Sequence, residues 1–335
     1  MTASNPGEVL LLTPEDVARL FDLHAIVSAV EEAFREKGLG RVQMPPKQYL
    51  FFEGGGDWRI MPAYIPSMRL AGVKTVGVNP QNPKRGLATV IALIELVDPD
   101  TGHPLAVMDG TLITAWRTGA AGAIAAKYMA RSGSTVMGVI GAGVQGRMQV
   151  YFTVETVRTI TRVKIFDVRR EAAKSLAVFV EKELGIDASI VDEPLAAVKG
   201  VDILATCTPA RSPIVRGDWI EEGLHINAIG ADAPGKEELD PAILQKARIV
   251  VDDFVQASHS GEINVPLEEG YISERDIYAE LGEVVAGLKP GRVDDREITI
   301  FDSTGLAIQD VAAARVVYEA ALRTGLGTRM KLVMA

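Results

Sequence analysis

The spacing of hydrophobic residues first predicts helices. Apolar side chains recur every three or four positions between residues 26 and 34, which is the period of one face of a helix. Asp22 is placed to cap the start of this helix, and Gly38 to end it. A Thr-Pro-Glu-Asp segment at 13–16 has the form of an earlier helix start, with a cap, a proline and an acid. The chain is therefore expected to open with two helices.

After residue 40 the apolar spacing becomes that of strands. Segments 48–52 and 58–61 flank Glu-Gly-Gly-Gly-Asp at 53–57, which predicts a hairpin. Further strands are expected at 71–78 and 89–96. Helices followed by a mostly antiparallel sheet make this first part an α+β unit.

From about residue 120 the predicted strands and helices alternate, which is typical of βαβ units on a parallel sheet. A last long helix is expected at 306–322. The predicted strands are 136–140, 163–166, 202–205, 225–229, 249–252 and 297–301.

Composition agrees with a globular protein of about two domains. The 335 residues are 47% hydrophobic and 24% charged, which is typical of a chain with a packed core. A net charge of −9 argues against a nucleic-acid partner or an anionic membrane surface, although a local basic site is still allowed. One cysteine, Cys207, and four histidines exclude an internal disulfide and a Cys/His zinc cluster, but leave a carboxylate magnesium site open.

The amino-terminal segment predicts no secretory signal, because it has neither a basic start nor a long apolar run. The sequence contains no stretch of about 18 apolar residues, so no membrane span is predicted. We therefore expect a cytoplasmic protein.

A glycine-rich turn carries the strongest chemical signal. Gly141, Gly143 and Gly146 form G-x-G-x-x-G directly after the apolar strand 136–140, where a helix is expected to begin. In dinucleotide-binding folds these glycines allow a tight turn, the approach of the pyrophosphate and close packing of helix on strand. Asp167 ends the next strand, 21 residues after Gly146, near the spacing of about 20 expected for a ribose-binding acid.

The same acid favours NAD over NADP. A carboxylate accepts the ribose 2′-hydroxyl of NAD and repels the 2′-phosphate of NADP. Arg169 and Arg170 follow Asp167 closely and leave NADP open as the alternative.

Three basic residues lie in the predicted α+β part, at places where surface charge is not expected. Lys74 lies in the middle of a strand, Arg59 lies in the second strand of the hairpin, and Lys47 directly precedes the hairpin. The ordinary interpretation of each is an outward-facing strand position. The functional interpretation is a site that binds an anion.

Two further candidates are Arg117 and Asp232. Arg117 is expected to open a helix over 118–126, where a cation opposes the helix dipole unless an anion is bound nearby. Asp232 follows the strand at 225–229, and ligands of parallel sheets lie at that end of the strands. A turn or helix-capping aspartate is the alternative for Asp232.

Six segments resemble the ornithine cyclodeaminase/mu-crystallin family, and the resemblance extends over nearly the whole chain. Within that family, 43–47 and 298–310 most resemble the archaeal alanine dehydrogenases. The six segments are Met-Pro-Pro-Lys at 44–47, Arg-Gly-Leu-Ala-Thr-Val at 85–90, Leu-Ala-Val-Met-Asp-Gly-Thr at 105–111, Arg-Thr-Gly-Ala at 117–120, Ile-Asn-Ala-Ile-Gly-Ala-Asp through Pro-Gly-Lys at 226–236, and Phe-Asp-Ser-Thr-Gly at 301–305.

The resemblance implies a homodimer and an α/β fold, with a Rossmann doubly wound parallel sheet inserted in a discontinuous α+β substrate and dimerisation domain. The boundaries expected here are 1–119 plus 306–335 for the substrate domain and 120–305 for the NAD-binding domain. The implied substrate-binding residues are Lys47, Arg59, Lys74 and Arg117. Asp232 matches the family's catalytic aspartate, and Lys74 is the other candidate acid/base. The implied cofactor contacts are Thr89, Arg117, Gly141, Gly143, Val144, Gln145, Gly146, Asp167, Thr206, Lys236 and Ser303.

The implied activity is NAD-dependent interconversion of L-alanine with pyruvate and ammonia. Ornithine cyclodeaminases carry an acid where this chain has Arg59, and a guanidinium there would repel the second ammonium group of a diamino acid. The alternatives are a ketimine or pyrroline-2-carboxylate reductase, then an ornithine cyclodeaminase, and finally a non-catalytic binding protein of the mu-crystallin type. Each of the enzymes binds a small carboxylate substrate.

Overall fold

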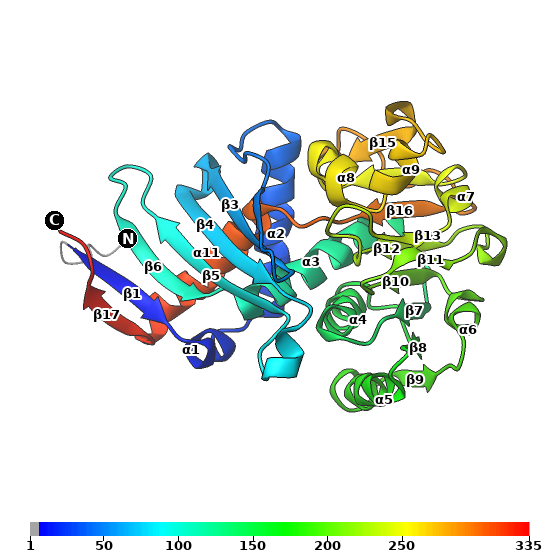
Figure 1. Cartoon of the computed structure of the whole chain (residues 1–335), viewed down its shortest axis with the longest axis horizontal. Helices are drawn as coiled ribbons and strands as arrows, with labels where there is room; N and C mark the ends of the chain where they lie inside the picture. The colour runs from blue at the N-terminus through cyan, green and yellow to red at the C-terminus, as the bar shows by residue number, and fades with distance from the viewer. Residues whose placement is uncertain (1–6, 335) are drawn as a thin grey trace. The chain divides into compact units, whose positions relative to one another are not determined.

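The computed structural model describes residues 7–334, which divide into two compact units. The first unit contains residues up to Arg117 and those from Leu306 onward, and the second contains Thr118–Gly305. The second unit is therefore inserted in the sequence of the first. Each unit is described by itself below (Figure 1).

The first unit is a seven-stranded mixed sheet in the order β17-β1-β6-β5-β4-β3-β2 (Figure 1). All neighbouring strands are antiparallel except β1 and β6. Helix α11 packs beside α2 and against β3, β4 and β5, so the two helices cover one face of the sheet. The elements are β1 (Glu8–Leu12), α1 (Pro14–Arg19), α2 (Leu23–Gly38), β2 (Gln48–Phe51), β3 (Asp57–Ile65), β4 (Leu70–Val78), β5 (Val90–Val97), β6 (Pro104–Asp109), the start of α3 (Thr111–Met129), α11 (Ala307–Thr324) and β17 (Thr328–Lys331).

The second unit is an eight-stranded parallel sheet in the order β15-β14-β16-β12-β10-β7-β8-β9 (Figure 1). Separate apolar cores cover its two faces, which makes the sheet doubly wound. The strands are β7 (Val136–Ile140), β8 (Arg162–Phe166), β9 (Asp187–Ile190), β10 (Ile203–Thr206), β12 (His225–Ala228), β14 (Arg248–Val251), β15 (Ile277–Glu280) and β16 (Thr299–Asp302), with a small separate pair, β11 (Arg211–Val215) and β13 (Glu237–Leu239). The helices are α4 (Val144–Thr156), α5 (Arg170–Phe179), α6 (Pro194–Val198), α7 (Pro241–Leu244), α8 (Phe254–Ser260), α9 (Asn264–Glu268) and α10 (Leu281–Val285).

The helix starts expected from the sequence are confirmed. Thr13 and Asp16 form a reciprocal capping box on α1, and the Asp22 side chain accepts a hydrogen bond from the backbone of Ala25 at the start of α2. The strand pattern missed β1 and β17, which pair with one another at the edge of the first sheet. β1 also pairs with β6, so it lies between two strands, whereas β17 is the edge strand.

Within residues 7–334, no helix is long and apolar enough to cross a membrane. The same residues hold no group of three or more His, Cys, Asp or Glu side chains suited to a metal ion. The cytoplasmic location stays a prediction.

Candidate active site

The sheet of the first unit places Arg59 and Lys74 on its covered face. In register, Lys74 of β4 lies between Met61 of β3 and Ile94 of β5, and both of these neighbours are buried. Arg59 is opposite Val76, two residues along β4, so its side chain is on the same face as that of Lys74. Both cations are buried, which corrects the ordinary expectation that such residues face outward.

A carboxylate from α11 pairs with two of the predicted cations. Asp310 Oδ1 accepts hydrogen bonds from Lys74 Nζ at 2.8 Å and from Arg117 Nε at 2.9 Å. Arg117 also donates to Gln309 Oε1 at 3.1 Å. All these side chains are buried, so α11 supplies the acceptors that hold two cations side by side.

The polar atoms of Gln309 and Asp310 do not all have hydrogen-bond partners within residues 7–334. Asp310 Oδ2 and Gln309 Nε2 are buried there without a hydrogen-bond partner. Buried polar atoms are rarely left unpaired unless a ligand or water completes them. The cluster therefore has the character of a binding site rather than of a finished structural network.

The environment of Lys74 brings its ammonium group into the neutral range. Burial and the positive charges of Arg117 and Lys47 lower the pKa of Lys74 from 10.5 to about 7, although Asp310 opposes the shift. A lysine with this pKa is half-charged at neutral pH and can accept or donate a proton there.

The charge of the cluster is smaller than the four cations suggest. Arg59 forms a two-point pair with Asp57, with distances of 2.6 Å from Nε and 3.1 Å from Nη2, and its guanidinium lies 5.2 Å from the ring centroid of Tyr49. Asp57 and Asp310 together balance two of the four cations. The net charge of these four cations and two acids is therefore at most two positive charges.

The expectation that Arg117 opens a helix is wrong. Helix α3 begins at Thr111, where Asp109 accepts a hydrogen bond from the backbone of Leu112, so Arg117 lies inside the helix. Asp310 and Gln309, and not an anion at a helix start, account for the cation at this position. The sequence alone had no signal of these partners, because they lie more than 190 residues away.

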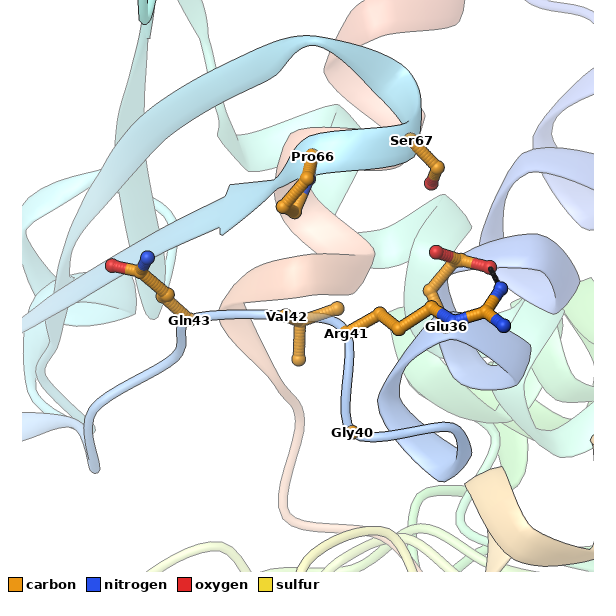
Figure 2. A pocket seen from close by; sticks show the side chains of 7 residues that line it. All are labelled: Glu36, Gly40, Arg41, Val42, Gln43, Pro66 and Ser67. Atoms are coloured by element: carbon orange, nitrogen blue, oxygen red, sulfur yellow. Dashed lines mark ion pairs between the residues drawn. The ribbon is translucent and has the colours of Figure 1, made fainter.

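An open pocket in the first unit lies apart from these cations. Pro66 and Ser67 face the 40–43 loop across it, and the buried Glu36 faces Arg41 (Figure 2). None of the predicted site residues lines this pocket. It is therefore not the candidate site.

In the second unit the glycine turn has the geometry of a dinucleotide site. Gly141 has a φ of +96°, and a Cβ at Gly146 would overlap the carbonyl oxygen of Gly141. Nothing lies within 4 Å of the place where a Cβ of Gly143 would be, so that part of the turn is open to a ligand. Helix α4 begins at Val144, and its free N–H groups are suited to a pyrophosphate.

Asp167 lies directly against this turn. Its Oδ2 accepts a hydrogen bond from the backbone of Ala142 at 2.7 Å, and its Oδ1 accepts one from the backbone of Arg169, also at 2.7 Å. The Arg169 side chain is 72% exposed, and that of Arg170 pairs with Asp192. The Asp167 carboxylate is thus fixed at the turn by two backbone hydrogen bonds, whereas the side chains of Arg169 and Arg170 are mostly exposed.

The remaining predicted cofactor residues divide between the two units. Ser303 Oγ and Gln145 Oε1 are buried in the second unit without a hydrogen-bond partner among the described residues, which fits polar contacts to a ligand. Thr206 is buried at the end of β10, and Val144 is exposed at the start of α4. Thr89 belongs to the first unit and lies on an exposed loop before β5, so its contact with a cofactor stays a prediction.

Asp232 lies on the loop after β12. Its Oδ1 accepts a hydrogen bond from Lys236 Nζ at 2.5 Å, and the two side chains are 31% and 18% exposed. A partly exposed acid beside a lysine can bind or orient a ligand, or it can exchange a proton with one. The structure thus brings Asp232 together with Lys236 in one unit, and the four cations together in the other.

Sequence reasoning missed Asp57, Gln309 and Asp310. A weak signal existed for Asp310, because it is an acid within the apolar pattern of the last helix. No local pattern indicated its partners.

The profile of the ornithine cyclodeaminase/mu-crystallin family matches residues 8–325. The chain belongs to this family. The resemblance inferred from the sequence is thereby confirmed, as is the α/β fold with a Rossmann-like parallel sheet and a separate mixed sheet.

Several members of the family are similar over nearly their full length. An alanine dehydrogenase of Archaeoglobus fulgidus is 54% identical over 327 residues, which cover 97% of this chain and 98% of that protein. The structure of an archaeal alanine dehydrogenase dimer with bound NAD has a TM-score of 0.94 and 54% identity, covering 97% of this chain and all of that one. The structure of Thermococcus litoralis Δ1-pyrroline-2-carboxylate reductase with NADH and L-proline has a TM-score of 0.93 and 42% identity, covering 96% and 99%.

Proposed function

We propose that this protein is an NAD-dependent alanine dehydrogenase that interconverts L-alanine and water with pyruvate and ammonia. The observation that carries the proposal is the 54% identity to an archaeal alanine dehydrogenase over 97% of the chain. The buried cations of the first unit and the glycine turn of the second supply the two kinds of site that the reaction needs.

The residues of the glycine turn, with Asp167, Gln145, Thr206, Lys236 and Ser303, would hold the dinucleotide. When bound, NAD accepts the hydride from Cα of the substrate. Asp167 favours NAD over NADP, because its carboxylate accepts a ribose hydroxyl and repels a phosphate.

The cations of the first unit would anchor the substrate carboxylate. Lys47, Arg59 and Arg117 supply charge-assisted hydrogen bonds, and the pairing with Asp57 and Asp310 fixes the two guanidinium groups in orientation.

The proton chemistry needs a group that titrates near neutrality. Neutral Lys74 would take a proton from the substrate nitrogen, and the iminium left by hydride loss would then add water and expel ammonia. Asp232, beside Lys236, is the second candidate for the transfer to and from water. We favour Lys74 for the first step, because its pKa of about 7 suits a base at neutral pH.

A homodimer is part of the proposal. The face of the first sheet opposite Lys74 carries exposed apolar residues, among them Leu50 of β2 and Ile91 and Leu93 of β5. Exposed apolar residues gathered on one sheet face favour burial against another protein surface. A similar archaeal alanine dehydrogenase is a dimer.

A pyrroline-2-carboxylate reductase is the second candidate function, since a reductase of that specificity is 42% identical to this chain. Initial rates distinguish the two. We expect NADH formation with L-alanine, and faster NADH oxidation with pyruvate and ammonia than with Δ1-pyrroline-2-carboxylate. The reverse order of rates would establish the reductase. NAD-dependent turnover of ornithine would indicate a cyclodeaminase, and NADH binding without turnover of any substrate would indicate a binding protein.

A further inference from the structure

One buried carboxylate connects two loops that follow the carboxyl ends of neighbouring strands of the parallel sheet. Glu238 Oε1 accepts a hydrogen bond from the backbone of Thr208 at 2.7 Å, and its Oε2 accepts one from the backbone of Gly230 at 2.9 Å. Thr208 follows β10 and Gly230 follows β12, two neighbouring strands in parallel register. Glu238 itself has no exposed surface.

The loops are in direct contact at this point. A Cβ at Gly230 would overlap the Thr208 carbonyl oxygen and lie 2.5 Å from Glu238 Oε2. Beyond Gly230 the loop carries Asp232, and its far end is held by Asn264, which accepts from the backbone of Gly235 at 2.9 Å and donates to the carbonyl of Lys236 at 2.9 Å. The Asp232 loop is therefore tied at both ends.

A second buried carboxyl group holds the first. Glu262 Oε1 accepts hydrogen bonds from the backbone of Glu238 at 2.8 Å and of Leu239 at 2.6 Å. Glu262 Oε2 has no hydrogen-bond partner among residues 7–334. Glu262 is also fully buried, and neither glutamate forms an ion pair with a described residue.

Counting acceptors assigns different protonation states to the two glutamates. Both oxygens of Glu238 accept from fixed backbone N–H groups, an arrangement that favours the acceptor-only carboxylate over the protonated acid. Only one oxygen of Glu262 accepts, so the other can carry a proton without losing a bond. Burial, with the charges of Glu238 and Asp302, raises the pKa of Glu262 well above its usual range, in agreement with this assignment.

Burial also raises the pKa of Glu238, but hydrogen bonds from Thr208 and Gly230 act against that rise. Two neighbouring acids without a cation cannot both ionise at low cost, so the proton stays on one of them. The donors favour Glu238 as the ionised member.

We propose that ionised Glu238 is a positioning residue that holds the Asp232 loop against the Thr208 loop, while protonated Glu262 fixes the backbone of Glu238 without adding a second buried charge. The inference rests on the proposed function only where activity is measured.

The same substitution at the two positions separates their roles. Glu238→Gln turns an amide NH₂ toward a backbone N–H that needs an acceptor, so one loop loses its bond; we expect kcat/KM for L-alanine to fall about tenfold or more. Glu262→Gln keeps the accepting oxygen and replaces the protonated one by NH₂. The kcat/KM of this variant should therefore be at least about tenfold higher than that of Glu238→Gln. Equal losses in the two variants would overturn the proposal.

The pH dependence of stability tests Glu262 without any assay of activity. A carboxyl group whose pKa is raised by folding stabilises below its unfolded pKa of about 4.5, and this contribution is lost as pH rises toward the folded value. Glutamine does not titrate, so the Tm of Glu262→Gln should exceed that of the wild type by a margin that grows from pH 5 to pH 9. A margin that does not change with pH would refute the assignment, even if Glu238→Gln fails to fold.

The two proposals fail in different ways. A wild-type enzyme without alanine turnover would refute the proposed function, whereas the Tm comparison, and the NADH affinity of the two variants measured by fluorescence, would still report on the glutamates.

Discussion

Removing the charge of Asp310 should move the pH profile of the enzyme. Asp310→Asn keeps an oxygen that Lys74 and Arg117 can share, but deletes a negative charge that stabilises protonated Lys74. An opposite charge at hydrogen-bonding distance typically shifts a pKa by about 1 to 3 units. The pKa of Lys74, about 7 in the wild type, should therefore fall by at least about 1 unit.

The size of the effect follows from the fraction of neutral Lys74. With a pKa of about 7, roughly one tenth of Lys74 is neutral at pH 6. In the variant at least about half would be neutral at that pH. If neutral Lys74 is the base, kcat/KM at pH 6 relative to each enzyme's own plateau should rise about fivefold.

The assay is the initial rate of NADH formation from L-alanine at low substrate concentration between pH 5 and pH 9. Normalising each profile to its plateau removes any general loss of activity, which we expect because an unbalanced buried cation is costly. Asp57→Asn is the matched control: it removes an acid from Arg59, whose charge does not titrate in this range, and should leave the midpoint near its wild-type value. An unmoved or raised midpoint in Asp310→Asn would refute the role of Lys74 as the base that Asp310 tunes.

Three further predictions concern the cofactor, the dimer and the core. Asp167→Ser should lower the ratio of kcat/KM for NAD to that for NADP by about tenfold or more, measured with both cofactors at fixed alanine; an unchanged ratio would show that the acid does not select the cofactor. Leu93→Glu should shift the protein toward monomers in sedimentation experiments, because it places a charge on the exposed apolar sheet face, whereas Val255→Glu, at an exposed position of α8 in the other unit, should not. Burial lowers the pKa of His225 to about 3, so this neutral histidine stabilises above its unfolded pKa of about 6.5, and that contribution is lost as pH falls; His225→Gln should therefore reduce the decline in Tm between pH 6.5 and pH 4, and equal slopes would contradict it.

Much of the fold was predictable because its signals are local. The parallel strand 136–140 and the cap at Asp22 appear as the spacing implied, and Gly141, expected to make a tight turn, has a positive φ. The short strands β1 and β17 were not predicted; β17 is an exposed edge strand that pairs with β1, and β1 lies between β17 and β6. The start of α3 was also misplaced, because Asp109, which accepts a hydrogen bond from the backbone of Leu112 in its first turn, also ends strand β6.

The candidate site was also predictable only in part. The sequence by itself determined which residues are unusual: a lysine and an arginine within strands, and an acid after a parallel strand. Only the tertiary structure decided which side chains each of them contacts. Lys74 and Asp310 are 236 residues apart, and their hydrogen bond exists because α11 returns to cover the sheet that carries Lys74.

Burial then sets the chemistry. A strand pattern can show that a lysine is unusual, but the pKa of Lys74 depends on desolvation and on charges brought by segments distant in the chain. In the same way, the sequence shows Glu238 and Glu262 only as two acids near a loop, and the backbone N–H groups that the fold directs at them decide which one keeps its proton. Residue types are local information, whereas their protonation and orientation are properties of the packed structure.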